Sequence, residues 1–505
     1  FGSTQGRLSL SQSAFGGNGG RSNNESYANA GTGGHASSSL TVADTSAHSL
    51  SLHVGATGGT GGQTFYGNAG AGGSSLAYAN GSSVGDVQVQ AETKAGSGGA
   101  SFRPIAGSTG AAGGTATAKA IGVTTGASRS DVSAAATGGS GGDVDTRANG
   151  GNGGAASVSA RGQSGRGAVT VAASATGGNG GRGSGFNAET GQGYSGGHGA
   201  SVVLFNAVSG STRGHLSLSQ TAYGGNGGDF VGALDAQHPG TAAAGGNASS
   251  SLTLIDRAAS GLSGSVSAHG GDGGIDLDSD TASTDGSGIA SISLASTRRG
   301  ARVYSLADAS GGASGHEEGR SLGRAFASAA SLEYANAQAI AAGGSRGLPA
   351  DGSPLVGTAT AAAVARTTLA GKSSNAFSQA THGFTVLSTA DSFAAGAGMA
   401  SSRAYGGGAT GAVRATSTSM PGSTAGAGGS VSGRRVVASA SATLGSTADV
   451  YTRTSFGGTG LSLPDLRHAS NGQNAFSYAD GAPRSSTVNS QLNAHPHVRA
   501  SMDGM

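Results

Sequence analysis

Leu50-Ser51-Leu52-His53-Val54-Gly55-Ala56-Thr57-Gly58-Gly59-Thr60-Gly61-Gly62 joins the two patterns that decide how this chain folds. In its first half, Leu and Val alternate with Ser and His, and this period of two is typical of a half-buried β-strand. Its second half is a Gly-Gly-x-Gly-Gly motif. The stretch therefore predicts a strand that leads directly into a glycine segment.

The Gly-Gly-x-Gly-Gly motif recurs at nearly regular intervals. Successive copies lie 37 to 47 residues apart, which is the length of one supersecondary repeat. The copies occupy residues 16–20, 58–62, 138–142, 177–181, 224–228 and 270–274, with a degenerate copy at 95–99. A regular interval predicts that the chain is built by stacking one unit.

Each unit has the same order of parts. An alternating segment comes first, and a short polar connection joins it to a second alternating segment that leads into the motif. After the motif come a variable stretch and a second glycine cluster, as at Gly31–Gly34. Glycine tolerates φ > 0 and allows close backbone approach, so we expect the motifs to be corners that bend or end the strands. Helix signals are poor, and residues 329–342 are the best helical candidate.

The composition limits the kind of core that the chain can form. Of 505 residues, 100 are Gly, 5% are aromatic and 11% are charged, whereas about a quarter is usual for charged residues. One unit has too few bulky side chains to fold alone, but stacked units share a thin core of Ala, Val and Leu. The sequence predicts an all-β fold, with a β-solenoid of repeats of about 42 residues preferred to an elongated β-sandwich of stacked hairpins. A disordered low-complexity chain is the alternative.

The pattern divides the chain into three parts. Residues 1–345 carry the regular repeats, residues 346–460 carry degenerate β-repeats, and residues 461–505 resemble neither. Six of the eight Pro residues lie beyond residue 345. Terminal repeats of stacked proteins are atypical, so residues 461–505 are interpreted as a cap or an assembly segment.

Charge and cysteine content exclude several classes of function. The net charge is only +2, so there is no basic surface field of the kind that holds nucleic acid. Without cysteine there is neither a disulfide framework nor thiol chemistry. No apolar run reaches 18 residues, so we expect no membrane span. The chain begins at Phe1, as signal-peptide removal or trimming would leave it.

The Ala-Thr-Gly-Gly-x-Gly-Gly units at 56–62, 136–142 and 175–181 resemble the glycine- and alanine-rich repeats of secreted bacterial surface proteins. They are also similar to glycine-rich repeats of mycobacterial surface proteins and to fibre-forming parts of bacterial adhesins. The resemblance is compositional and covers about two thirds of the chain. It implies an extracellular, structural or adhesive role, and it assigns no functional residue.

Calcium is the one cofactor that the residues suggest. Asp276, Asp278 and Asp280 alternate as the first ligands of an EF-hand loop do, but the Gly and Glu of that loop are missing. Asp229 follows the motif at 224–228 as in a calcium-binding nonapeptide. These four residues are candidate Ca²⁺ ligands, and a solvated acidic loop is the alternative interpretation.

No enzymatic activity is predicted. Gly193-Tyr194-Ser195-Gly196-Gly197 matches the Gly-x-Ser-x-Gly pattern of a nucleophile elbow, but the strand-to-helix turn that this elbow needs has no sign in the sequence. In a chain this rich in Gly and Ser, such matches arise by chance. The repeat therefore carries the functional argument.

The sequence favours a structural subunit of an extracellular bacterial fibre, sheath or matrix that self-assembles into a homopolymer through strand edges. Leu8, Leu10 and Phe15 alternate in the first strand and are the predicted assembly residues. The alternative is a glycan-binding adhesin or phage-type fibre. That alternative predicts clustered aromatic side chains in the variable stretches, where 65–66, 102, 186, 194 and 230 are aromatic.

Overall fold

A computed structural model describes residues 4–23, 28–103, 109–186, 193–232, 240–277, 281–313, 321–344, 357–395, 398–419, 424–432, 435–443, 447–455, 465–470, 474–480, 487–492 and 498–503. These residues form strands and extended segments and no helix. The all-β prediction is confirmed. Residues 329–342, the best helical candidate, lie instead in the end of one strand and the whole of the next.

The chain divides into two units, which are described separately. The first consists of Phe1–Ser251, Ser267–Ile289 and Gly311–Ser321, and the second of Leu252–Val266, Ala290–Ser310 and Leu322–Met505.

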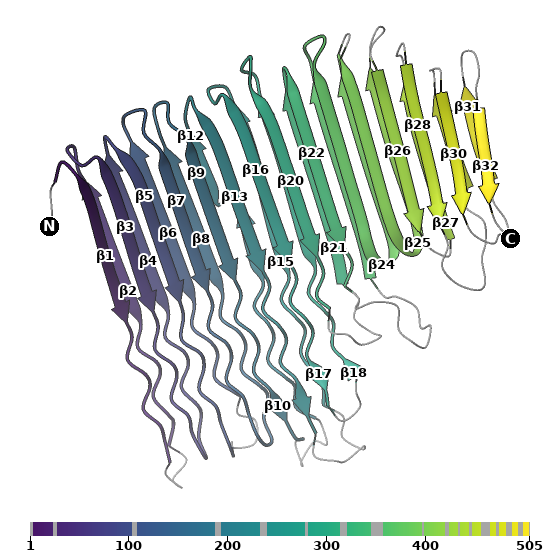
Figure 1. The fold of residues 1–505 in the computed structure, drawn as a ribbon. Coiled ribbons are helices and arrows are strands. Elements are labelled where there is room, and N and C mark those ends of the chain that lie inside the picture. The colour runs from purple at the N-terminus through teal and green to yellow at the C-terminus, as the bar shows by residue number, and fades with distance from the viewer. Residues whose placement is uncertain are drawn as a thin grey trace. The chain divides into compact units, whose positions relative to one another are not determined.

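In the first unit, two parallel sheets run along the stack of coils (Figure 1) and face each other. Sheet one pairs β1 (Arg7–Phe15), β3 (Ser49–Thr57), β5 (Asp86–Lys94), β7 (Ser130–Thr137), β9 (Val169–Thr176) and β13 (His215–Tyr223). Sheet two pairs β2 (Ala36–Ala43), β4 (Ser75–Ser83), β6 (Ala116–Thr124), β8 (Ala156–Gln163) and β12 (Val208–Ser211). Consecutive strands within each sheet come from consecutive coils, which is the parallel pairing of a β-solenoid.

The core of the first unit lies between the two sheets. Along β3, buried and half-buried residues alternate without a break, and Leu50 and Leu52 are buried. Sheet two faces them with Ala and Gly: a Cβ on Gly81 would lie 2.9 Å from Leu52 Cδ1. Large side chains on one sheet thus fit against small ones on the other, so the sheets pack close together.

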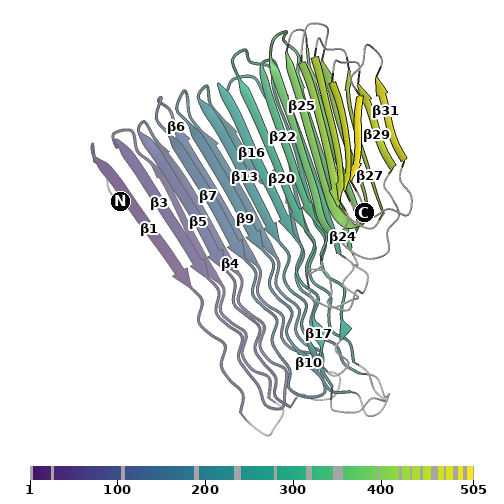
Figure 2. The same ribbon diagram turned by 45° about the vertical axis from the view of Figure 1, so that its right-hand side comes forward.

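Beyond the strands, each coil of the first unit continues into a pair of glycine arms. The outgoing arm holds the Gly-Gly-x-Gly-Gly motif (for example 58–62), and the returning arm holds the second glycine cluster (for example 70–73). The arms appear as wavy traces below the strands (Figures 1 and 2). Beyond them lie the short strands β10 (Gly183–Ser184), β14 (Phe230–Val231), β17 (Ile275–Asp276) and β18 (Thr281–Ala282).

Backbone N–H groups in an arm point in three directions in turn. Gly58 donates to Lys94 O at the end of β5 in the next coil (2.9 Å), and Gly59 donates to Gly34 O of the preceding returning arm (2.9 Å). Thr60 donates outward to Asn18 Oδ1 (3.0 Å). A period of three is that of a polyproline II helix, which has three residues per turn. The spacing of Gly-Gly-x follows from it, because two of every three residues face another arm.

The strands end at the motifs, as predicted, and the predicted close backbone approach is confirmed, but the predicted positive φ and the corner are wrong. No motif glycine is among those with positive φ, which in the described chain are Gly185, Gly300 and Gly371. The motifs extend the coil instead of ending it. Glycine is required because neighbouring backbones approach closely: a Cβ on Gly59 would lie 2.0 Å from Gly17 O.

In the second unit the coils become shorter. β24 (Ser373–Ala394) pairs with two strands: its first half with β22 (Tyr334–Ala342) and its second half with β23 (Gly357–Thr367). Paired residues Ser374, Ala400 and Ala425 are 26 and 25 residues apart, against 42 for Leu8 and Leu50 in the first unit. Facing halves of β24 are joined by buried hydroxyl pairs, including Ser378 with Ser388 at 2.7 Å.

The remaining strands follow in chain order. They include β11 (Val202–Phe205), β15 (Ala248–Asp256), β16 (Gly261–His269), β19 (Gly288–Ser296), β20 (Arg302–Ser310) and β21 (Ser321–Ser331). Later strands are β25 (Met399–Ser419), β26 (Thr424–Ser432), β27 (Arg435–Thr443), β28 (Thr447–Ser455), β29 (Asp465–Ser470), β30 (Asn474–Asp480), β31 (Thr487–Leu492) and β32 (Val498–Asp503).

Candidate functional site

The outward positions of the glycine arms form ladders of side chains. Where the residue at the same position in the preceding coil is Asn or Asp, its side chain accepts from the outward N–H: Asn179 Oδ1 accepts from Asn226 N–H (2.9 Å), and Asn226 Oδ1 accepts from Asp272 N–H (3.0 Å). The returning arms repeat this arrangement, as in Asn152 with His198. The Asn and Asp side chains at the x position are therefore structural rungs, for which sequence reasoning had found no role.

Replacement of a rung tests this ladder. Asn179→Ala should lower the free energy of unfolding by about 1 kcal/mol, because one exposed hydrogen bond to the Asn226 N–H is lost. Asn179→Asp keeps the acceptor oxygen and should change stability much less. Thermal unfolding and hydrogen exchange at the Asn226 amide measure both variants. Equal exchange at Asn226 in the alanine variant and the unmodified chain would contradict the assignment.

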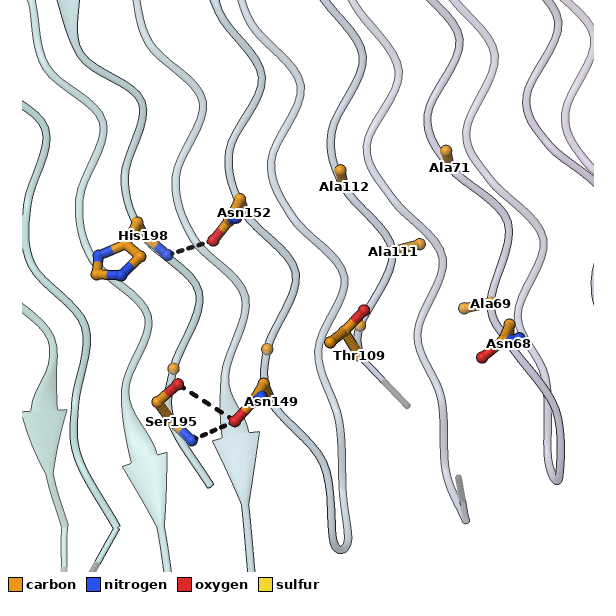
Figure 3. A pocket seen from close by; sticks show the side chains of 13 residues that line it. Asn68, Ala69, Ala71, Thr109, Ala111, Ala112, Asn149, Asn152, Ser195 and His198 are labelled. Carbon is orange, nitrogen blue, oxygen red and sulfur yellow. Dashed lines mark hydrogen bonds between the residues drawn. The ribbon is translucent and has the colours of Figure 1, made fainter. Parts of the chain in front are cut away.

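A shallow polar depression of about 430 Å³ lies on the returning arms. It forms where Ala71 and Ala112 occupy the outward position that Asn152 and His198 occupy in the next two coils. At its rim the N–H and Oγ of Ser195 both donate to Asn149 Oδ1, at 2.7 and 3.2 Å (Figure 3). Ser195, the residue of the elbow-like pattern, is thus a rung of the ladder.

An arginine and three aromatic residues gather beyond the outgoing arms of the first three coils. The Arg21 guanidinium carbon lies 5.4 Å from the centroid of the Phe65 ring and 6.0 Å from that of Phe102. The two Phe rings are 5.2 Å apart, and the half-buried Tyr66 ring is 6.4 Å from Phe65. We call Arg21, Phe65, Tyr66 and Phe102 the aromatic cluster.

The other aromatic residues of the variable stretches lie elsewhere. Tyr194 and Phe230 are buried, with exposed fractions of 7% and 1%. A Cβ on Gly240 would lie 2.0 Å from the Phe230 ring, so Phe230 packs inside its coil. The structure thus brings together Phe65, Tyr66 and Phe102, whereas Tyr194 and Phe230 are not part of this cluster.

The predicted assembly residues lie on β1, in the first described coil. Leu8 is buried, Leu10 is half-buried and Phe15 is 79% exposed. Their partners one coil later are better covered: Leu52, which is in register with Leu10, is 1% exposed. Among the described strands β1 pairs with β3, on one edge. Leu10 is therefore less covered on β1 than Leu52 is at the same position on β3.

The candidate calcium ligands are only partly described. Asp276 is a buried residue of β17 and pairs with Thr281 of β18. Asp229 Oδ1 accepts from the Ile275 N–H at 2.9 Å, as a rung of the ladder. Asp278 and Asp280 lie outside the described residues. Within the part that is described, no three Asp, Glu or His side chains form a group that could hold a metal ion. Calcium binding stays a prediction.

Asp44 ends β2 with a turn that depends on its charge. Its Oδ1 accepts from the backbone N–H groups of Ser46 and Ala47, both at 2.7 Å, and from the Ser46 hydroxyl. These hydrogen bonds, that from the Ser46 N–H foremost, lower the pKa of Asp44 from its ordinary value of 3.8. In the second unit, the bond from Lys372 Nζ and that from the Gly300 N–H likewise lower the pKa of Glu333.

Stability should depend on pH through Asp44. Since its pKa is lower in the folded chain, the ionised carboxylate contributes stability above pH 3.8, and that contribution is lost as the pH falls through the folded pKa. Asp44→Asn should therefore lower the unfolding temperature at pH 7, with a difference that shrinks in more acidic buffer. Melting curves of both chains between pH 2 and pH 7 measure this. A difference that is constant with pH would contradict it.

No helix among the described residues is long and apolar enough to cross a membrane. Comparisons with family models, curated proteins and solved structures gave no match to this chain.

Proposed function

We propose that the chain is a structural subunit of an extracellular bacterial fibre, sheath or matrix, and that it self-assembles through the edges of its strands. One observation carries the proposal: the coils of the first unit are bonded to one another by continuous backbone ladders. Leu8, Leu50, Val87 and Ser130 follow one another in register in four parallel strands, and the arms below them are bonded in the same way.

This bonding supports a mechanical role for two reasons. Backbone hydrogen bonds between coils do not depend on particular side chains, so they can be extended by a further coil of similar backbone geometry. Stability in such a stack is approximately a sum over neighbouring coils. Assembly at the end of the stack would therefore lengthen it with contacts of the kind that already hold it together.

Imaging of the purified chain tests the proposal. We expect negative-stain electron microscopy to show fibres or linear oligomers, and light scattering after gel filtration to give a mass that increases with protein concentration. Dispersed monomers at every concentration would contradict the proposal.

The aromatic cluster favours one second function, a glycan-binding adhesin or phage-type fibre. Half-exposed rings beside an arginine offer apolar faces and hydrogen-bond donors to a sugar. Under this alternative, Phe102→Ala should abolish binding on a glycan array, whereas Phe326→Ala, at an exposed position of the second unit, should not. An array without a ligand for the unmodified chain would exclude it.

A further inference from the structure

The polar depression on the returning arms is elongated along the stack and crosses four coils (Figure 3). Its floor is a column of small residues that includes Gly110 and Gly150. Its two sides are columns of outward residues, one with Asn149 and Ser195 and the other with Asn152 and His198. Neighbouring coils lie about 4.8 Å apart, so four coils span roughly 14 Å. This outline suits an extended chain better than a single ion.

Two backbone N–H groups on one side of the depression have no partner of the kind found in the next coil. His198 N–H donates to Asn152 Oδ1 at 2.9 Å. The residues that precede Ala112 and Asn152 in this column are Ala71 and Ala112, whose methyl groups cannot accept. For the N–H groups of Ala112 and Asn152, no acceptor occurs among the described residues. Both residues are exposed and line the depression, so these two donors are available to a ligand.

The carboxamides of Asn149 and Asn152 add donors of a second kind. Asn149 Oδ1 accepts from the Ser195 N–H at 2.7 Å, and Asn152 Oδ1 accepts from the His198 N–H. A backbone N–H can only donate, so each one fixes the oxygen toward the next coil and leaves the Nδ2 amino group as the other end of the carboxamide. Within the described part of the chain, neither Nδ2 group has an acceptor. Each carboxamide therefore offers N–H donors in the lining of the depression.

Acceptors are scarce in the same lining. Ala112 O accepts from the Gly72 N–H at 3.0 Å, and Asn152 O is bonded in the same way to the coil before. No Asp or Glu is among the described residues that line the depression. An extended peptide would bring N–H groups that find no acceptor here, which is unfavourable. A chain with surplus acceptors fits instead, and ionised acceptors make the stronger hydrogen bonds.

We propose that the polar depression binds a linear acidic polysaccharide. Its carboxylates accept from the N–H groups of Ala112 and Asn152 and from the Nδ2 groups of Asn149 and Asn152. Acidic groups recur along such a chain, as the donors recur from coil to coil along the stack. Repeat proteins use the extended surfaces of their stacked units to hold elongated partners. The inference goes beyond the proposed function, because binding here does not require copies to associate.

Asn152→Asp tests the proposal without removing the rung. Asp keeps the oxygen that accepts from the His198 N–H, but it replaces the Nδ2 donor by a negatively charged oxygen. We expect the affinity for oligogalacturonate, a linear chain of uronic acids, to fall about tenfold or more in isothermal titration calorimetry, because like charges then meet. Asn179→Asp is the matched control. It makes the same change to a rung on an outgoing arm, outside the depression, and should leave the affinity unchanged.

Ala112→Asn is a second variant, with opposite effects on binding and on stability. Its Oδ1 should accept from the Asn152 N–H, as Asn152 Oδ1 accepts from His198. The unfolding temperature should therefore stay the same or rise. The new side chain should also fill the depression and occupy one of its donors, so oligogalacturonate should bind more weakly. Unchanged binding by this variant and by Asn152→Asp would place the polysaccharide elsewhere and overturn the proposal.

Three probes compared on the unmodified chain test the kind of ligand. Oligogalacturonate should bind more tightly than monomeric galacturonate and than a neutral cello-oligosaccharide of the same length. Equal affinity for the neutral chain would overturn the acidic preference, and equal affinity for the monomer would leave a site for a single anion only. Absence of binding by all three would overturn the proposal altogether. Fibre formation is scored separately by electron microscopy, so none of these outcomes decides the proposed function.

Discussion

Gly139→Ala should lower the free energy of unfolding by about 3 kcal/mol or more and remove hydrogen-exchange protection from the adjoining arms. The new Cβ would lie 1.9 Å from Gly96 O and 2.8 Å from Gly114 N. Both are backbone atoms, and Gly139 N–H is itself bonded to Gly114 O at 3.0 Å. No side chain can turn aside to relieve the overlap, so the arms must separate.

Ser140→Ala is the matched control for this experiment. Ser140 is the neighbour of Gly139 in the same motif and occupies the outward x position. Its replacement should change the free energy of unfolding by no more than about 0.5 kcal/mol. Thermal unfolding with hydrogen exchange at the arm amides measures both. Similar losses for the two variants would contradict the division of the motif into inward glycines and an outward residue.

The second large effect is expected in the core between the sheets. A Cβ on Gly122 of β6 would lie 2.6 Å from Cγ2 of Val132 in β7. Gly122→Ala should therefore cost about 1–3 kcal/mol of unfolding free energy through over-packing. Because the closest contact is with the Val132 side chain, Val132→Ala should relieve the clash. The loss of unfolding free energy in the double variant should then be about 1 kcal/mol smaller than the sum of the losses in the two single variants.

A double-mutant cycle measured by chemical denaturation tests this complementarity. The matched control pairs Gly122→Ala with Val54→Ala. Val54 is equally buried and on the same sheet, but it is not among the atoms nearest to the Gly122 Cβ position. We expect the losses of that pair to add. Additive losses for Gly122 and Val132 as well would show that the two sheets do not fit together through this contact.

Several features could be predicted from the sequence because they depend on local pattern. The alternation in Leu50-Ser51-Leu52 fixes which side chains of β3 face the core, since successive residues of a strand point to opposite faces. The spacing of the motifs fixes the length of a coil. The calcium ligands and the aromatic cluster could not be predicted from local pattern. Each consists of residues from different coils, and such residues come together only when the coils stack.

The corner with positive φ that was expected at the motif was the main error, whereas the close backbone approach expected there is confirmed. Glycine at a strand end is a common sign of a turn, and nothing in one copy distinguishes a turn from close backbone packing. The period of three within Gly-Gly-x-Gly-Gly was a usable signal, since it matches three residues per turn of a polyproline II helix. Asn179 and Asn226 at the x position gave a further signal, because an amide oxygen can accept an outward N–H.

By itself, the sequence determined that this protein is an all-β stack of similar units, because alternation and interval are properties of the chain read in order. Only the tertiary structure decided what the recurring glycines do. They extend each coil into arms whose backbones bond to one another, and a Cβ at Gly59 or Gly139 would occupy the place of a neighbouring carbonyl. That requirement comes from the coil alongside, roughly forty residues away in the chain, and a single motif contains no record of it.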